Sequence, residues 1–220
     1  MADKPLIVLN FKLYPEAAGR RALVLAQKIA KIKKNGYEII VVPSLTTMKE
    51  IADKTTLTVF AQHVDPVPLG AYTGQIAMDE LKELGINGSL INHSERKVSL
   101  SIIRDTLELA RQKKFTLIVC ASSLSEVKKI ALMKPPYLAY EPSELIGGDL
   151  SVCEAQPEVI VKAVEIVKAL SPDTKVLCGA GVNKKEDVSQ ALLLGAEGVL
   201  IGHAAPKAKD PKKFLEELLL

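Results

Sequence analysis

Residues 137–149 of the chain read Tyr-Leu-Ala-Tyr-Glu-Pro-Ser-Glu-Leu-Ile-Gly-Gly-Asp. The apolar start of this stretch is typical of a buried strand, and Glu141 follows at its end. Pro142 fixes its own φ and favours extended geometry at Glu141, while the glycine pair permits unusual backbone angles. The stretch predicts a strand, a positioned carboxylate and a hinged loop, as a catalytic base beneath a closing lid requires. An ordinary strand end with a glycine turn is the simpler alternative.

Similar apolar runs recur along the whole chain, and segments with helical patterns separate them. Continuous apolar runs fit strands that are buried on both faces of a parallel sheet. The predicted strands cover residues 5–10, 37–42, 57–61, 87–91, 115–119, 137–140, 175–178 and 198–201. Eight strand–helix units without a linker favour an α/β fold in which residues 1–220 form a single (β/α)8 barrel domain of eight parallel strands. An open doubly wound sheet is the alternative, although no GxGxxG or P-loop motif follows the first strand.

Capping and breaking residues predict where the helices lie. The first helix should run from Pro15 to residues 35–36, and a later one should cover residues 75–84. The other predicted starts are Ser94, Ser123 (in a capping box with Glu126), Pro157, Asn183 (in a capping box with Glu186) and Asp210-Pro211.

Composition limits the classes of function. The hydrophobic fraction is 48% with 4% aromatic residues, so the core must consist mainly of Val, Ile, Leu and Ala. The net charge of +3 comes without a basic block, which predicts no nucleic-acid partner. The first apolar run breaks at Asn10 and Lys12, too early for a signal peptide or a membrane span. Cys120, Cys153 and Cys178 lack CxxC spacing, so neither a disulfide framework nor a zinc site is predicted, and a cytoplasmic location is the default.

Polar residues follow the predicted strands at the end where such barrels carry their chemistry. Alternation places Asn10 and Lys12 on the same side of the first strand, and His93 follows the fourth. The seventh and eighth strands end in the turns Gly179-Ala180-Gly181 and Gly202-His203. Alone, Lys12 is typical of a solvated lysine and His93 of a loop histidine. Together with Glu141 on one rim, these residues predict an active site.

Four motifs closely resemble those of the triosephosphate isomerase family, in the same order and at similar separations over the whole chain. They are Asn10-x-Lys12, residues 70–74 (Gly-Ala-Tyr-Thr-Gly), residues 92–96 (Asn-His-Ser-Glu-Arg) and residues 139–142 (Ala-Tyr-Glu-Pro). The chain is shorter than the bacterial and eukaryotic forms and is similar to the compact archaeal type. The resemblance implies a TIM barrel that interconverts dihydroxyacetone phosphate and D-glyceraldehyde 3-phosphate in glycolysis and gluconeogenesis, without a metal or an organic cofactor.

The resemblance also implies roles for the residues at the rim. Glu141 would move the proton through a cis-enediol(ate), with His93 and Lys12 as electrophiles. Asn10 would orient the substrate, and Glu95 would support the site. Because His93 precedes the helix predicted from Ser94, the positive helix end should keep its imidazole neutral. The family is itself a familiar example of such pKa tuning, so this mechanism is not a new inference.

The substrate phosphate should bind mostly to backbone N–H groups at glycine turns and at the lid tip. By resemblance and position these groups belong to Gly147, Gly181, Gly202 and His203. Closure of the lid would exclude water and hinder loss of phosphate from the enediolate.

The lid departs from the family pattern. Glu144 stands where a Trp is usual, and residues 147–149 read Gly-Gly-Asp instead of Gly-Thr-Gly. Asp149 should face away from the phosphate, because an inward carboxylate would repel it. His203 replaces a small residue, and its backbone N–H can still serve.

The loop that carries Thr73 predicts self-association. In this family the loop reaches a partner subunit beside its Asn10 and His93, so we expect a homodimer, or a homotetramer by resemblance to short archaeal forms. His63, in the same loop, has no catalytic match and is predicted to be an interface or surface residue.

Two other functions stay open on the sequence. A phosphate-binding barrel without turnover is disfavoured because Asn10, Lys12, His93 and Glu141 are all present. The other is a different phosphosugar isomerase or an aldolase on a related barrel. An aldolase would need a Schiff-base lysine within a strand, and the rough candidates, Lys12 and Lys175, do not sit in an apolar mid-strand environment.

Overall fold

The computed structural model describes residues 4–142 and 155–219 of the chain. Within these ranges eight strands lie where the apolar runs predict them, with bounds that differ by at most two residues. The strands are β1 (Leu6–Asn10), β2 (Glu38–Val42), β3 (Thr58–Val59), β4 (Gly88–Ile91), β5 (Thr116–Ala121), β6 (Tyr137–Tyr140), β7 (Lys175–Gly179) and β8 (Gly198–Ile201).

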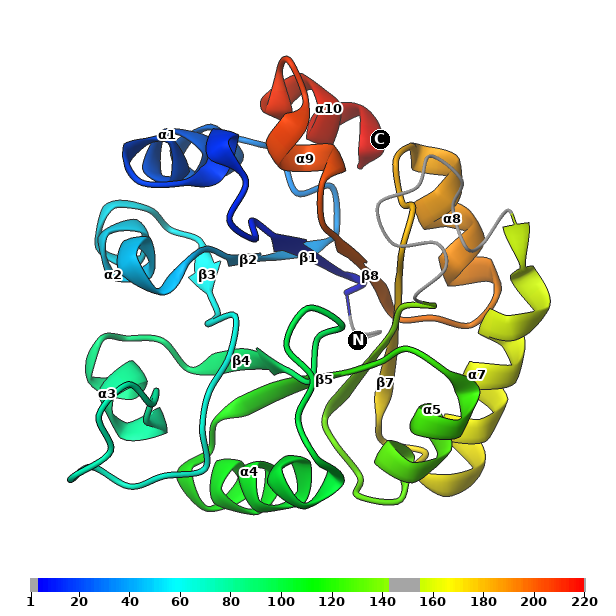
Figure 1. Ribbon diagram of the computed structural model, residues 1–220. Coiled ribbons are helices and arrows are strands. Elements are labelled where there is room, and N and C mark those ends of the chain that lie inside the picture. The colour runs from blue at the N-terminus through cyan, green and yellow to red at the C-terminus, as the bar shows by residue number, and fades with distance from the viewer. Residues whose placement is uncertain (1–3, 143–154, 220) are drawn as a thin grey trace.

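The described strands are parallel and form one sheet in the order β3-β2-β1-β8-β7-β6-β5-β4. The two edges meet through a parallel bridge between Ala61 and Ser89. There the Ala61 N–H donates to the Gly88 carbonyl, and the Leu90 N–H donates to the Ala61 carbonyl, both at 2.9 Å. The sheet therefore closes into a barrel, and the open-sheet alternative is wrong. Figure 1 shows the strands at the centre of a ring of helices.

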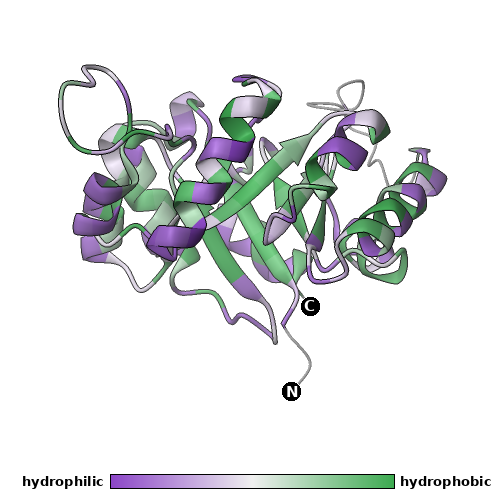
Figure 2. Ribbon diagram, turned by 90° about the horizontal axis from the view of Figure 1, so that it is seen from below, coloured by the Kyte–Doolittle hydropathy of each residue, from purple (hydrophilic) through white to green (hydrophobic). Residues whose placement is uncertain are grey.

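The helices lie outside the barrel and turn their apolar faces toward it (Figure 2). They are the 3-10 turn η1 (Pro15–Ala17) and α1 (Arg20–Ile29), α2 (Leu45–Lys54), α3 (Met78–Glu83), α4 (Leu100–Lys113), α5 (Leu124–Ala131), α7 (Pro157–Leu170), α8 (Lys185–Leu193), α9 (Ala204–Lys207) and α10 (Pro211–Leu218). Across the described ranges, none of them is long and apolar enough to cross a lipid bilayer.

The predicted bounds of several helices differ from the structure. Instead of a single helix from Pro15 to residues 35–36, η1 is separated from α1 by residues 18–19, where Gly19 adopts a positive φ of 54°, and α1 ends at Ile29. Helix α4 begins at Leu100, with the Ser99 hydroxyl accepting the Ile102 N–H at 3.3 Å, and not at Ser94. Ser94 lies in a turn closed by the Arg96 N–H, which donates to the His93 carbonyl at 2.8 Å. The chain completes this turn before the helix begins.

The predicted capping boxes are correct only in part. The Ser123 hydroxyl accepts the Glu126 N–H, but the Glu126 carboxylate accepts the Ser122 N–H instead of closing the box on Ser123. At α8 the carboxylate of Asp187, not Glu186, accepts the N–H groups of the preceding residues. The Asp210 cap of α10 is confirmed. Helix α3 is shorter than the predicted 75–84 because residues 65 and 77 pair in a parallel bridge just before it.

The barrel has two apolar layers. Inward-facing side chains fill its interior, and these are Leu6, Val8, Ile40, Val42, Phe60, Leu90, Ile118, Cys120, Ala139, Leu177 and Leu200. Outward-facing side chains of the same strands form a second layer with the helices. Strand residues alternate between the two layers. The next inward-facing residue beyond the last one in each strand's core therefore lies at the carboxyl end of the barrel.

The long loop between β3 and α3 is anchored at its base and exposed at its tip. His63 is buried, and its Nε2 lies 3.0 Å from Asp65 Oδ1. The prediction that His63 is a surface residue is therefore wrong within this chain. The other Asp65 oxygen accepts the Ile76 N–H at 2.8 Å. Leu69 and Tyr72, beside Thr73, are 63% and 42% exposed. A fixed base therefore presents an apolar tip to solvent.

Candidate active site

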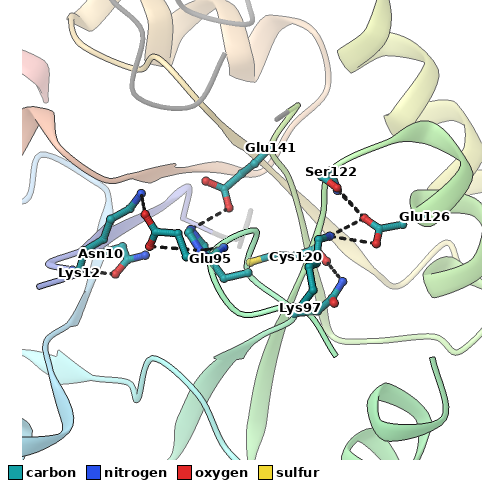
Figure 3. A network of polar contacts seen from close by, with 10 residues as sticks. Asn10, Lys12, Glu95, Lys97, Cys120, Ser122, Glu126 and Glu141 are labelled. Carbon is teal, nitrogen blue, oxygen red and sulfur yellow. Dashed lines mark hydrogen bonds and ion pairs between the residues drawn. The ribbon is translucent and has the colours of Figure 1, made fainter. Parts of the chain in front are cut away.

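The carboxyl ends of β1, β4 and β6 bring the predicted catalytic side chains together (Figure 3). Asn10 ends β1, His93 follows β4 by two residues, and Glu141 follows β6 directly. Each of these three polar side chains is buried. Buried polar groups at the open end of a barrel are typical of a ligand site.

Glu141 is held by the backbone of β5 and fits against Gly179 on the adjacent strand β7. Its N–H donates to the Ala121 carbonyl at 2.9 Å, so the pairing between β5 and β6 continues through this residue. The carboxylate side chain lies over Gly179, where an added Cβ would come within 2.3 Å of Glu141 Cγ. The space for the carboxylate therefore depends on glycine at position 179.

The surroundings of Glu141 make it a weak acid. Burial raises the pKa of Glu141 to about 7, against the Lys12 ammonium and a hydrogen bond from the Cys120 thiol. Burial and the neighbouring carboxylate in turn raise the pKa of the Cys120 thiol well above its usual value, so the thiol keeps its proton. A carboxyl group with a pKa of about 7 can accept and return a proton near neutral pH.

The imidazole of His93 faces Glu141 across a gap. The Glu95 N–H donates to His93 Nδ1 at 3.2 Å, so a neutral His93 carries its proton on Nε2. Nε2 lies 3.6 Å from Glu141 Oε2, and neither atom has a hydrogen-bond partner among the described residues. Buried polar atoms are rarely left unpaired, so a donor and an acceptor on the same space suit a ligand that bonds to both.

Burial keeps the His93 imidazole neutral. It lowers the pKa of His93 to about 4, and the Lys12 ammonium acts in the same direction. The helix that was expected to begin at Ser94 begins at Leu100, so the predicted contribution of a helix end is wrong. The expected neutral state is supported for a different reason, namely desolvation.

Lys12 is fixed by contacts on both sides of its backbone. It adopts a left-handed φ of 48°, and its N–H donates to Asn10 Oδ1 at 3.0 Å. Gln62 Nε2 donates to its carbonyl at 2.9 Å. Lys12 Nζ pairs with Glu95 Oε1 at 2.9 Å (Figure 3). Such a conformation costs free energy in a non-glycine residue, and persists because its surroundings determine it.

Two adjoining hollows meet at Asn10 and Lys12. The larger, of about 510 Å³, extends past His93 toward Gln62. The smaller, of about 20 Å³, is lined by Asn10, Lys12, Glu141, Ala180, Gly181, Val182, Leu200, Gly202 and His203. Three of the four predicted phosphate-binding residues thus lie around one hollow next to Glu141. Gly147, with Glu144 and Asp149, lies outside the described residues.

The turn after β7 has the backbone shape of an anion site. Ala180 and Gly181 adopt positive φ angles of 73° and 70°. Asn183 Nδ2 donates to the Gly181 carbonyl at 2.9 Å, and Asp187 accepts the Asn183 N–H at 2.8 Å. These bonds hold the turn beside the hollow, where backbone N–H groups can meet a negative group.

Comparison with known proteins connects this geometry to a family. The family model described as Triosephosphate isomerase matches residues 5–218. The chain belongs to the triosephosphate isomerase family. It is 41% identical to the triosephosphate isomerase of Methanothermus fervidus over 218 residues, which are 99% of this chain and 98% of that protein. It is 40% identical to that of Methanosarcina mazei over 98% of this chain and 97% of the relative, and 40% identical to that of Methanocaldococcus jannaschii over 97% and 98%.

The motifs of this triosephosphate isomerase family member do not indicate all the neighbours of its site. Sequence reasoning misses the thiol of Cys120, the space at Gly179 and the amide of Gln62. Alternation along β5 and β7 could have placed the first two inward, because Cys120 and Gly179 each follow an inward-facing residue by two positions. No local signal indicates that Gln62 reaches the Lys12 carbonyl.

The structure lends no support to the aldolase alternative for this family member. Lys12 is paired with Glu95, and Lys175 begins β7, at the end of the barrel away from Glu141. Within residues 4–142 and 155–219, no group of three or more His, Cys, Asp and Glu side chains could hold a metal ion. That the enzyme needs no metal and no organic cofactor stays a prediction.

Proposed function

We propose that the chain interconverts dihydroxyacetone phosphate and D-glyceraldehyde 3-phosphate, as a step of glycolysis and gluconeogenesis. The observation that carries the proposal is the pair of unpaired atoms, His93 Nε2 and Glu141 Oε2, which face one space 3.6 Å apart. His93 Nε2 can donate a hydrogen bond to a carbonyl oxygen of the substrate, and Glu141 Oε2 can accept the proton on the adjacent carbon.

Glu141 is the base in this mechanism. Its carboxylate takes the proton from the carbon next to the carbonyl, and the electron pair moves to the carbonyl oxygen to give a cis-enediol(ate). One proton then passes between the two oxygens of the enediol(ate), from the hydroxyl that becomes the new carbonyl to the oxygen that was the carbonyl. The protonated Glu141 returns its own proton to the neighbouring carbon, so atoms and charge balance. The Glu141 pKa of about 7 suits both the removal and the return of the proton, because neither form of the carboxyl group is strongly favoured near neutral pH.

His93 and Lys12 stabilise the oxygen that becomes negative. The Nε2–H of neutral His93 and the Lys12 ammonium are fixed before substrate binds, so no reorganisation is needed as charge develops. Asn10, which accepts the Lys12 N–H, orients the substrate in this proposal. Glu95 supports both electrophiles, through its N–H to His93 Nδ1 and its carboxylate to Lys12 Nζ.

The phosphate is assigned to the smaller hollow. Backbone N–H groups of Gly181, Gly202 and His203 bind it there. Gly147, which the resemblance adds to this set, lies outside the described residues. The positive φ angles of the turn at Ala180 and Gly181 support this assignment.

An enzyme assay tests the proposal directly. The wild type should convert D-glyceraldehyde 3-phosphate to dihydroxyacetone phosphate, measured by coupling the product to glycerol-phosphate dehydrogenase. Glu141→Gln should lower kcat by at least about 10³-fold, because an amide cannot take up the proton. Glu108→Gln, on an exposed part of α4, is the matched control and should match the wild type. A wild type without turnover, or a fully active Glu141→Gln enzyme, contradicts the proposal.

The assembly and setting of the enzyme belong to the same proposal. Self-association as a homodimer or homotetramer through the Thr73 loop is supported by the exposed apolar tip at Leu69 and Tyr72. A single domain over residues 1–220 is supported by the match to residues 5–218. A cytoplasmic location is supported by the buried thiol of Cys120, which forms no disulfide.

A further inference from the structure

We infer that Asn92 is a positioning residue for His93, and that its side-chain amide holds the loop of residues 93–98 in the geometry that the reaction needs. This inference deepens the proposed function and rests on it. Asn92 is the residue between the end of β4 and His93, and it is buried with 1% of its surface exposed.

The amide of Asn92 binds at both of its ends. Its Nδ2 donates to the Cys120 carbonyl on β5 at 2.8 Å, and its Oδ1 accepts the Val98 N–H at 3.1 Å. The first bond joins the end of β4 to the neighbouring strand. The second reaches across the turn and closes the loop on itself. One buried side chain therefore fixes both the start and the end of the segment that carries His93.

The backbone of Asn92 turns the chain into the site. Its φ of 59° lies in the left-handed region, which Gly, Asn and Asp adopt more readily than other residues. Glycine would adopt this angle but would provide neither hydrogen bond. The backbone angle alone would favour glycine at this position. The presence of asparagine therefore indicates that its two side-chain hydrogen bonds are needed.

The same loop sets the tautomer of His93. The Glu95 N–H reaches His93 Nδ1 only while the turn of residues 93–96 keeps its shape, with the Arg96 N–H on the His93 carbonyl. If the loop loosens, the Glu95 N–H moves away from Nδ1, and the proton of His93 is no longer confined to Nε2. His93 would then present the wrong nitrogen to the substrate oxygen for part of the time.

A second contact of the loop of residues 93–98, an ion pair with α5, is weaker. Lys97 Nζ pairs with Glu126 Oε2 at 2.7 Å, but their side chains are 37% and 29% exposed (Figure 3). Ion pairs that water can reach contribute little, whereas a buried amide cannot exchange its bonds for water. Asn92 is therefore the stronger constraint of the two.

Asn92→Asp is the sharpest test. Aspartate also tolerates a positive φ and keeps an acceptor for Val98, but it cannot donate to the Cys120 carbonyl, and its charge repels that oxygen. Asn92→Gly keeps the φ and removes both bonds. We expect kcat to fall about 10- to 100-fold in both variants, with KM changed less than about threefold, because a misplaced electrophile acts mainly in the transition state.

Asn35 provides a matched control. It also has a positive φ, of 45°, and its Nδ2 also donates to a backbone carbonyl, that of Leu219, at 3.2 Å. Asn35→Asp should destabilise the fold because it also loses a side-chain hydrogen bond to a backbone carbonyl. It should leave kcat per folded molecule unchanged. Equal kcat values in the Asn92 and Asn35 variants contradict the inference.

A ¹⁵N NMR spectrum of labelled histidine gives a readout that does not depend on turnover. The chain has 3 histidines, and His93→Gln identifies the signals of His93. At pH 7 the wild type should show His93 as a pure Nε2–H tautomer, whereas both Asn92 variants should show a mixture. An unchanged tautomer overturns the inference. A wild type that lacks turnover but shows this shift in its variants would sink the proposed function and leave the inference standing.

Discussion

At the scale of single residues, burial decides the chemistry of this site. Glu141 and His93 are both shifted toward their neutral forms by desolvation, with pKa values of about 7 and about 4. The Lys12 ammonium opposes the shift at Glu141 and adds to that at His93. A base that ionises near neutral pH thus faces a donor that stays neutral throughout the range in which the base works.

The pKa of Glu141 can be measured without substrate. In the unliganded enzyme with ¹³C-labelled glutamate, one carboxyl signal should titrate near pH 7 and be absent from Glu141→Gln. kcat/KM should fall roughly tenfold per pH unit below this value, because a protonated carboxyl group cannot accept the substrate proton. A titration in the ordinary range, near 4.5, contradicts the assigned role of burial. Because the folded-state pKa is raised, ionisation of Glu141 should also lower stability as pH rises between 4.5 and about 7.

At the scale of strands and turns, each element presents one or two residues to the rim. β6 presents Glu141, and β7 leaves room for it through Gly179. The turn after β4 presents His93, and β1 presents Asn10 and Lys12. The chemistry is therefore divided among strands that are distant in the sequence and whose carboxyl ends meet at one rim of the barrel.

Gly179→Ala tests the fit between β6 and β7. The new methyl group would lie 2.3 Å from Glu141 Cγ, so the carboxylate must move. A displacement of this kind should lower kcat by about 10²-fold. Gly88→Ala is the matched control, because its methyl group would meet the Phe60 ring at 2.3 Å inside the barrel. That variant should unfold at a lower temperature and keep the activity of its folded fraction. Equal activities of the two folded variants would argue against the fit.

At the scale of the whole molecule, a closed barrel carries a loop between β3 and α3 whose apolar tip is exposed. The base of that loop is fixed by Asp65, which contacts both His63 and the Ile76 N–H. Surfaces of this kind are often buried against a partner. In the proposed assembly the tip packs against a second copy of the chain.

Thr73→Arg tests that assembly. A large charged residue at the tip cannot be buried without a partner for its charge, so association should weaken by at least about tenfold in the dissociation constant. Light scattering should give a mass of two or four chains for the wild type and a smaller mass for the variant at the same concentration. Leu193→Arg replaces a residue that is 81% exposed on α8, and should leave the mass unchanged. A wild-type mass of one chain refutes the proposed assembly.

The sequence by itself determined where the strands lie and which side chains end them. Apolar runs and the chemistry of Pro, Gly and capping residues act over a few positions, so β6 and β8 have their predicted bounds and α7 has its predicted start. The same local signals placed the start of α4 wrongly, because the turn of residues 93–96 competes with it. Only the tertiary structure decided the closure at Ala61 and Ser89, the gap between His93 and Glu141, and their pKa shifts. These depend on burial and on contacts between distant residues, which no local pattern contains.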